Sequence, residues 1–186
     1  MIIAMMKNLE KLNKKIIFRT EWFNIEEETY QGFDALQNKP FYRINAPDGV
    51  IILATTAEKK ILLVRQFRPA LDAYTIEFPS GGILSGEKPE DAAKRELLEE
   101  TGYSCQEISP LLEGHVMLSR FSSKDYAFWG QKAEIKINPK KDKNMELLLW
   151  SHEELIQAIL KEEFNHFAMI SLLLLIQLKY NAFNPL

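Results

Sequence analysis

The sequence contains a single cysteine, Cys105, and only three histidines. One thiol cannot form a disulfide within the chain, and the cysteine and histidines do not have the spacing of a zinc site. A protein without disulfides suits a reducing compartment. We therefore expect a cytoplasmic protein.

Long apolar runs and an excess of basic charge are also lacking. The most apolar run, residues 168–178, is well short of the roughly 20 residues that span a bilayer. We interpret it as a buried core helix, and we expect no membrane partner and no secretory signal, since the apolar start at residues 1–6 is short. The 23 basic and 26 acidic residues give a net charge of −3, which argues against a nucleic-acid partner.

What the chain does have is apolar material for a core, because 46% of its 186 residues are hydrophobic. Hydrophobic patterns and turn residues predict strands, in chain order, over 16–30 (one or two strands), 41–46, 50–56, 60–67, 74–78, 114–118, 126–135 and 146–150. Helices are predicted at 89–101, 152–163 and 167–180, and an exposed loop at 138–144. The turn at 47–49 predicts a hairpin between its flanking strands. This order indicates a mixed-sheet α/β or α+β domain with helices against the sheet.

The ends of the helix predicted at 89–101 have clear signals. Pro89 suits the first turn, where a missing N–H costs nothing. Glu90 and Asp91 suit the positive end of the helix dipole. Gly102 suits the position just past the end, where a left-handed residue is common.

This helix carries an unusual acidic face. Glu96, Glu99 and Glu100 share one side of it, since residues three and four apart are neighbours on a helix. A solvated surface is the ordinary interpretation of charged residues on a helix. However, like charges at Glu96 and Glu100 repel, and Arg95 is placed to neutralise only Glu99. A divalent cation would remove the repulsion, and Mg²⁺ and Mn²⁺ prefer oxygen ligands of this kind.

A glycine-containing turn precedes the acidic helix. Gly81, Gly82 and Gly86 allow backbone groups to approach a ligand closely, although such a turn is often only a turn. The free N–H groups at a helix start also favour anions. Together, the turn and the acidic face suggest a metal held opposite a phosphate, with metal-bound water as the nucleophile.

The combined pattern resembles the signature of the Nudix hydrolases. That signature is a Gly, five residues, a Glu, seven residues, Arg-Glu, an apolar residue, any residue, Glu-Glu, any residue, a Gly and an apolar residue. The matching positions are Gly81, Glu87, Arg95, Glu96, Leu97, Glu99, Glu100, Gly102 and Tyr103. Only Tyr103 departs from the usual aliphatic residue.

The resemblance implies an α/β/α sandwich with a mixed sheet, and hydrolysis of a nucleoside diphosphate linked to another group. It implies that Glu96, Glu99 and Glu100 bind Mg²⁺ or Mn²⁺, with the Ser80 carbonyl as a further ligand; Glu99 and Glu100 also count as catalytic. Glu87 would pair with Arg95 to brace the turn against the helix. That role is structural, like those of Gly81 and Gly102.

The segment 64–82 is similar to the region ahead of the signature in ADP-ribose pyrophosphatases and related nucleotide-sugar hydrolases. The likeness implies that Arg68 and Glu77 help to bind substrate, while an ordinary surface role for Arg68 stays open. Residues 1–46 are similar to the extra antiparallel strands with which such enzymes form homodimers, and 47–186 would be the hydrolase domain. Trp22 is a candidate to stack on the base; simple packing is the alternative.

Two departures concern the catalytic base. The turn after the signature, within 117–130, has no proline, and the later loop 138–146 is mostly basic where a glutamate base is usual. Asp125, Asp142 and Glu146 are the candidates that remain, each with a plain surface role as its alternative. Asp125 is the one that we assign to catalysis.

The leading functional prediction is a metal-dependent pyrophosphohydrolase of ADP-ribose or a similar nucleoside diphosphate sugar, a small-molecule nucleotide substrate. One alternative is a hydrolase of nucleoside triphosphates or dinucleoside polyphosphates. The other is a non-catalytic sensor of nucleotide sugars, which would keep the metal and nucleotide site but lack a base.

Overall fold

The computed structural model describes residues 10–32, 36, 39–137 and 144–182, which fall into two compact units. The first unit contains Met1–Pro47 together with His115–Lys124. The second contains Asp48–Gly114 and Asp125–Leu186. The segment 115–124 thus groups with the N-terminal strands, although it is distant from them in sequence.

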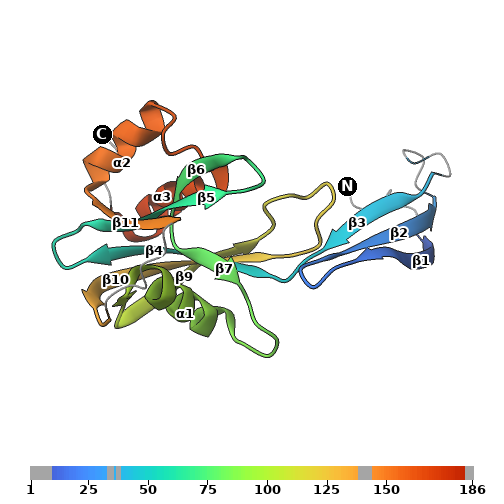
Figure 1. Ribbon diagram of the computed structural model, residues 1–186, viewed down its shortest axis with the longest axis horizontal. Helices are drawn as coiled ribbons and strands as arrows, with labels where there is room; N and C mark the ends of the chain where they lie inside the picture. The colour runs from blue at the N-terminus through green and yellow to red at the C-terminus, as the bar shows by residue number, and fades with distance from the viewer. Residues whose placement is uncertain (1–9, 33–35, 37–38, 138–143, 183–186) are drawn as a thin grey trace. The chain divides into compact units, whose positions relative to one another are not determined.

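The first unit is an antiparallel sheet with the order β1-β2-β3 (Figure 1). Its strands are β1 (Glu10–Arg19), β2 (Asn24–Gln31) and β3 (Phe41–Asn45). A parallel bridge joins Ile44 to Phe121, and the Ser122 N–H donates to the Ile44 carbonyl at 3.1 Å. These contacts tie the segment 115–124 to the end of β3.

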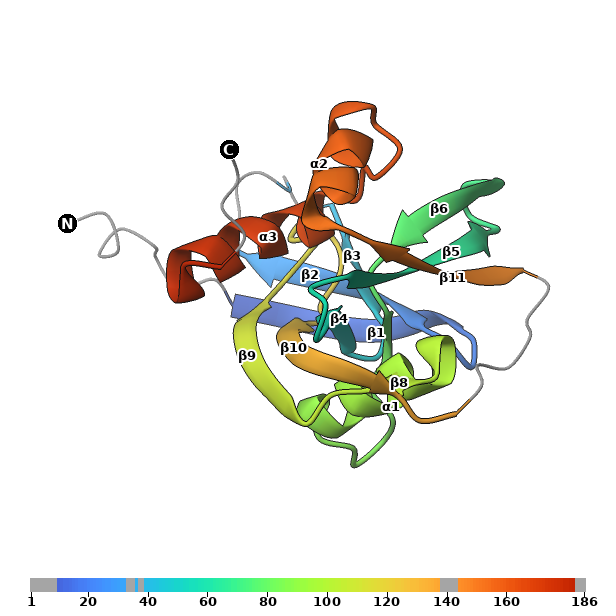
Figure 2. The ribbon, with the colours of Figure 1, turned by 90° about the vertical axis from the view of Figure 1, so that its left-hand side faces the viewer.

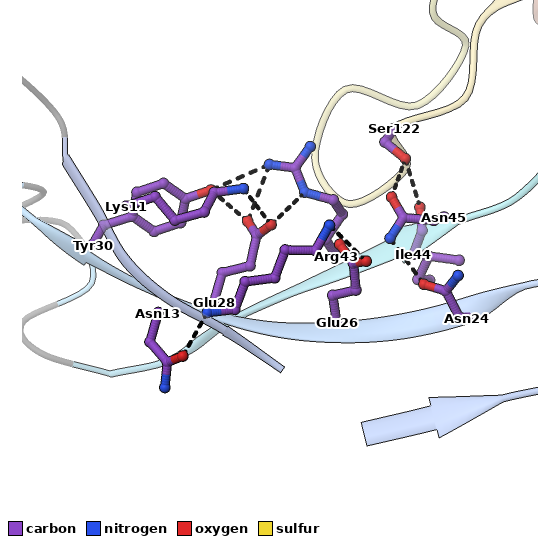
Figure 3. A network of polar contacts seen from close by, with 11 residues as sticks. Lys11, Asn13, Asn24, Glu26, Glu28, Tyr30, Arg43, Ile44, Asn45 and Ser122 are labelled. Carbon is purple, nitrogen blue, oxygen red and sulfur yellow. Dashed lines mark hydrogen bonds and ion pairs between the residues drawn. The ribbon is translucent and has the colours of Figure 1, made fainter. Parts of the chain in front are cut away.

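Two acidic side chains are buried in this first unit (Figure 3). Glu28, on β2, receives hydrogen bonds from Lys11 on β1, from Arg43 on β3 and from Tyr30. Burial alone would raise the pKa of Glu28, but these donors outweigh it and hold the pKa at about 2. Glu26, two residues earlier on the same face, pairs with Lys14 at 2.8 Å.

The second unit contains an eight-stranded mixed sheet. Its main path has the order β11-β5-β4-β10-β8, with β6 paired to β5, β7 to β4 and β9 to β10. The strands are β4 (Gly49–Thr56), β5 (Ile61–Arg68), β6 (Ala73–Glu77), β7 (Ser80–Gly82), β8 (Tyr103–Ser104), β9 (Glu107–Gly114), β10 (Asp125–Ile135) and β11 (Met145–Trp150). The β4–β10 pair is parallel and the other pairs are antiparallel.

Helices cover both faces of this sheet (Figures 1 and 2). They are α1 (Pro89–Thr101), α2 (His152–Leu160) and α3 (Phe167–Tyr180). Alternate residues of β4 enter two separate cores: Ile52 packs in the core that contains Leu97 of α1, and Leu53 in the core that contains Leu155 and Met169 of α2 and α3. Burial on both faces explains the continuous apolar run of β4. The predicted α/β/α sandwich with a mixed sheet and additional antiparallel strands is confirmed.

The predicted hairpin across 47–49 is wrong. The strand before this turn, β3, pairs with β2, whereas the strand after it, β4, pairs with β5, β7 and β10. The chain therefore passes from one sheet to the other at this turn. The physical reason is that β4 is apolar on both faces, so it gains most from a central place in the larger sheet.

Three other predictions about local structure need correction. The strand predicted at 114–118 lies earlier in the chain, as β9, which ends at Gly114. The sequence did not indicate a strand there, because Pro110 is unusual inside a strand. Ser80–Gly82 forms the short strand β7, where the glycines indicated a turn. The apolar run at 168–178 buries one side only, because Leu174 and Leu178 are exposed. The loop predicted at 138–144 lies outside the described residues except for Asn144.

Candidate active site

Helix α1 fixes the direction of the acidic face. It begins at Pro89 and ends at Thr101, as the sequence predicts, and Gly102 follows in the left-handed conformation with φ 77°. The Gly102 N–H donates to the Leu98 carbonyl at 2.9 Å, which closes the last turn. Ala93 and Leu97 are fully buried against the sheet. The glutamates on the other side of the helix consequently face away from this core.

The Glu87–Arg95 pair connects the turn that precedes α1 to the helix. The guanidinium donates two hydrogen bonds of 2.9 Å to the carboxylate, and its Nη2 also donates to the Gly82 carbonyl at 2.9 Å. The Glu87 carboxylate accepts the Leu84 N–H at 2.9 Å as well. The hydrogen bonds from Arg95 and then from Leu84 lower the pKa of Glu87 to about 2. This bidentate pair holds β7, the turn and the helix in one arrangement.

Glu96 lies directly over Gly81. A Cβ atom added at Gly81 would lie 2.1 Å from Oε1 of Glu96, so no residue with a side chain fits there unless the carboxylate moves. Arg95 Nη1 also contacts this carboxylate, at 2.6 Å. Burial raises the pKa of Glu96 despite that contact. Gly81 is therefore required by the close approach of a carboxylate to the backbone.

Glu100 is the most desolvated member of the acidic face. It accepts a hydrogen bond of 3.1 Å from the Ser80 N–H, which joins the helix to β7 at a second point. Burial is the main cause that raises the pKa of Glu100 to about 8; the negative charges of Glu96 and Glu77 add to it. A cation bound nearby would favour the charged form of this carboxylate.

The glutamates of α1 do not form a ready-made metal cluster. Glu99 is 60% exposed and contacts Arg95 at 3.4 Å. Glu96 contacts Arg95 as well, whereas Glu100 contacts the Ser80 N–H. Within the described ranges, no three His, Cys, Asp or Glu side chains are arranged to hold an ion. The donor set still fits a hard cation in its chemistry, because it consists of carboxylate and carbonyl oxygens beside a glycine. Binding would require Glu96 and Glu99 to exchange Arg95 for the ion.

A cavity of about 380 Å³ lies beside the predicted substrate residues Arg68 and Glu77. The Arg68 guanidinium donates to the Glu77 carboxylate at 2.8 and 2.5 Å, and the Thr75 hydroxyl donates to it at 2.5 Å. Burial alone would raise the pKa of Glu77, but the hydrogen bonds from Arg68 and Thr75 outweigh it, so the pKa is lower than usual. His166 also lines the cavity, and its Nδ1 accepts the Met169 N–H at 3.4 Å. Sequence reasoning gave Thr75 and His166 no role, because only the fold brings them to Arg68.

The candidates for the catalytic base lie in different places. Asp125 begins β10, and the register places it opposite Gly49 of β4, which in turn faces Gly82 of β7. Asp125 therefore lies in the same row of the sheet as the glycine whose carbonyl binds Arg95. Glu146 lies on β11, 60% exposed and 3.6 Å from Arg65. Asp142 lies outside the described residues.

Trp22, the candidate for base stacking, belongs to the first unit. It lies between β1 and β2, and its side chain is 71% exposed. Its backbone N–H donates to the Thr20 hydroxyl at 3.1 Å within the turn. The exposed indole does not pack in a core, in contrast to the alternative that the sequence left open.

Comparison with known proteins decides the family. Residues 46–173, more than half of the chain, match the family model described as NUDIX domain. The chain belongs to the Nudix family. Among the described residues of this Nudix protein, no helix has the length and hydrophobicity to cross a membrane.

Several relatives of this Nudix protein have named activities. It is 43% identical over 68 residues to an ADP-ribose pyrophosphatase of Bacillus subtilis, a match that covers 37% of each chain. It is 48% identical over 62 residues to an ADP-sugar pyrophosphatase of Mus musculus, covering 32% of this chain and 28% of the relative. The matched stretches thus span about a third of these relatives.

A solved structure confirms the fold. The crystal structure of an ADP compounds hydrolase superposes with a TM-score of 0.76 and 21% identity, covering 92% of this chain and 94% of the other. At this level of identity the likeness concerns the arrangement of helices and strands, and not the substrate.

Proposed function

We propose that this Nudix protein hydrolyses the diphosphate linkage of ADP-ribose or a similar nucleoside diphosphate sugar, giving a nucleoside monophosphate and a sugar phosphate. The observation that carries the proposal is the junction of β7 and α1. There the Glu96 carboxylate lies close to the backbone of Gly81, and the Glu100 carboxylate accepts a hydrogen bond from the Ser80 N–H. The Glu87–Arg95 pair connects the same turn to the helix. The names of the relatives from Bacillus subtilis and Mus musculus support the choice of substrate.

We propose Mg²⁺ or Mn²⁺ as the cofactor, held by Glu96, Glu99, Glu100 and the Ser80 carbonyl. When bound, such an ion neutralises phosphate oxygens and makes water a better nucleophile. Burial raises the pKa values of Glu96 and Glu100, and a bound cation would favour the charged forms of both carboxylates. The role of Glu87 and Arg95 is then to fix the turn, so that the carboxylates stay beside the backbone of Ser80 and Gly81.

The remaining side chains would bind and orient the substrate. In this proposal Arg68, held by Glu77, donates to a phosphate oxygen, because a guanidinium offers donors that suit phosphate. Asp125 accepts the proton of the attacking water from its place at the start of β10. Trp22 offers an exposed ring on which a base can stack.

We also propose that the chain forms a homodimer through residues 1–46, with 47–186 as the hydrolase domain, and acts in the cytoplasm. Support comes from β1, which is exposed along its whole length and carries Leu12 and Phe18 at 58% and 51% exposure. An edge strand with apolar side chains favours pairing with another chain. Light scattering would show about twice the 21.6 kDa of one chain, and a mass of one chain would contradict the dimer.

The direct test is a substrate panel. Nucleotide sugars, nucleoside triphosphates and dinucleoside polyphosphates are incubated with Mg²⁺ or Mn²⁺, and products are detected as phosphate after treatment with alkaline phosphatase. Glu100→Gln should reduce turnover by at least 100-fold. Glu90→Gln is the matched control, since Glu90 is an exposed glutamate on the same helix. Its ion pair is with Lys94, away from the acidic face. Absence of turnover with every compound would overturn the proposal.

One comparison favours a second candidate. An RNA pyrophosphohydrolase of Bartonella bacilliformis is 31% identical over 118 residues, which cover 52% of this chain and 69% of the relative. We therefore keep hydrolysis of triphosphates as the alternative. Release of pyrophosphate from a nucleoside triphosphate, with nucleotide sugars left intact, would support it. Thermal stabilisation by a nucleotide sugar without turnover would instead indicate a sensor.

A further inference from the structure

A second cavity, of about 430 Å³, lies in the second unit at the other end of β4 from the candidate active site. The acidic helix is linked to β7, and β7 pairs with Gly49–Ile51 at the start of β4. The second cavity is lined by Thr55 and Thr56 at the end of that strand. The other lining residues that matter here are Lys59, Trp129, Gln131, Lys132 and Asn181. None of these residues belongs to the site described above.

Trp129 lines this cavity and carries a buried N–H group that makes no hydrogen bond to a described residue. Trp129 is only 8% exposed, and its Nε1 has no hydrogen-bond partner among the described residues. Its ring packs against Tyr180 at a centroid distance of 4.7 Å, which fixes the indole. A buried N–H without an acceptor costs about 1–3 kcal/mol. The cost disappears if a ligand in the cavity supplies an acceptor atom.

The charges around the cavity favour an anion. Lys59 and Lys132 are exposed lysines at its edge, neither forms an ion pair with a described residue, and none of the described lining residues is acidic. Glu58, on the same turn, hydrogen-bonds its own backbone and Thr56 and is not part of the lining. The end of α3 at Asn181 contributes only a partial negative charge, which two full positive charges exceed.

Both lysines have an uncommon backbone conformation. Lys59 has φ 62° and Lys132 has φ 51°, in the left-handed region that residues with a Cβ seldom occupy. Lys59 belongs to the turn between β4 and β5, where its N–H donates to the Thr56 carbonyl at 3.0 Å. Lys132 lies at the irregularity in the pairing of β10 with β4, between Gly130 and Ala133. The two turns place their lysines at one cavity from different parts of the sequence.

We propose that this cavity is a second ligand site, which binds the phosphate group of a small phosphate monoester. The Trp129 N–H and the two ammonium groups would donate to the phosphate oxygens, and a phosphate monoester carries about −1.5 to −2 charges near neutral pH, which matches two lysines. The cavity is also much larger than a single small ion needs, since a water molecule takes about 30 Å³ of liquid. The remaining space, next to Gln131 and Asn181, would take the organic part.

The test is calorimetric titration of the full chain with AMP, ribose 5-phosphate and inorganic phosphate. EDTA is present, so that a metal-dependent site does not contribute. We expect binding of one monoester per chain, at least fivefold tighter than inorganic phosphate, with a change in tryptophan fluorescence. Lys59→Gln and Lys132→Gln should each weaken binding at least tenfold. Trp129→Phe keeps the ring but removes the N–H, and should weaken binding and abolish the fluorescence change.

Two variants serve as matched controls. Lys136→Gln removes an equal charge just past the end of β10, where Lys136 pairs with Glu134 outside the cavity. Arg68→Gln removes the cation of the other cavity. Neither should change the affinity for the monoesters. Absence of saturable binding, unchanged affinity in both cavity-lysine variants, or loss of binding only with Arg68→Gln would each overturn the proposal, whatever the substrate panel shows.

Discussion

Replacing Glu28 by glutamine tests how the first unit is stabilised. The Glu28 side chain is fully buried and accepts charged hydrogen bonds from Lys11 and Arg43 (Figure 3). Its pKa falls from 4.5 to about 2. At about 1.4 kcal/mol for each pKa unit, this difference of roughly 2.5 units corresponds to about 3 kcal/mol. Lys11 and Arg43 are partly exposed, so solvent recovers part of this, and we expect a loss of about 2–3 kcal/mol at pH 7.

The sign of the pH dependence follows from the direction of the shift. Because the folded pKa is lower than the unfolded one, the ionised carboxylate stabilises the fold above about pH 4.5, and this contribution is lost as the pH falls toward 2. The wild type should therefore lose stability on acidification. Glu28→Gln has no charge to lose at this position, so the difference between the two proteins should shrink steadily between pH 4.5 and 2.

Urea unfolding at pH 7 and pH 3 measures this difference, and hydrogen exchange of residues 24–31 locates it in β2. Glu27→Gln is the control, since Glu27 lies on the other face of the same strand, where it accepts a 3.1 Å hydrogen bond from the Tyr42 hydroxyl. We expect the control to cost less than about 1 kcal/mol. Equal losses for both variants, or an NMR titration that places the pKa of Glu28 at 4.5 or above, would refute the reasoning.

Three further predictions concern the second unit. Gly81→Ala should lower turnover at least tenfold with little change in melting temperature, because its Cβ would lie 2.1 Å from Glu96 Oε1; unchanged activity would contradict the close approach. Ser151→Ala removes the hydroxyl that accepts the Glu154 N–H at the start of α2 and should cost about 1 kcal/mol in urea unfolding, whereas Ser151→Asp should not. Phe164→Ala should lower the free energy of unfolding by about 3–5 kcal/mol, since Phe164 is fully buried with its ring centroid 5.2 Å from that of Phe78. Phe164→Leu should lower it clearly less, and similar losses for the two variants would argue against a cavity effect.

Features that depend on neighbouring residues could be predicted from the sequence alone. Pro89 and Gly102 set the ends of α1, because proline removes a donor that the first turn does not use and glycine accepts the left-handed conformation. The resemblance to the Nudix signature implied the pairing of Glu87 with Arg95, and the structure contains this pair at 2.9 Å. The central strands β4 and β5 followed from their apolar residues. The signature of the candidate site was therefore readable before the fold was known.

Which distant segments of the chain meet could be learned only from the fold. The turn at 47–49 has the local chemistry of a hairpin, yet the strands on either side of it join different sheets, because pairing depends on the burial of both faces of β4. The orientation of the glutamates on α1 could not be predicted either, because it depends on the contact of Arg95 with Glu96 and on the hydrogen bond from the Ser80 N–H to Glu100. The cavity at Trp129 combines three separate stretches of chain. Contacts of this kind carry no periodic signal in the sequence, because their energy arises only once the sheet has brought the side chains together.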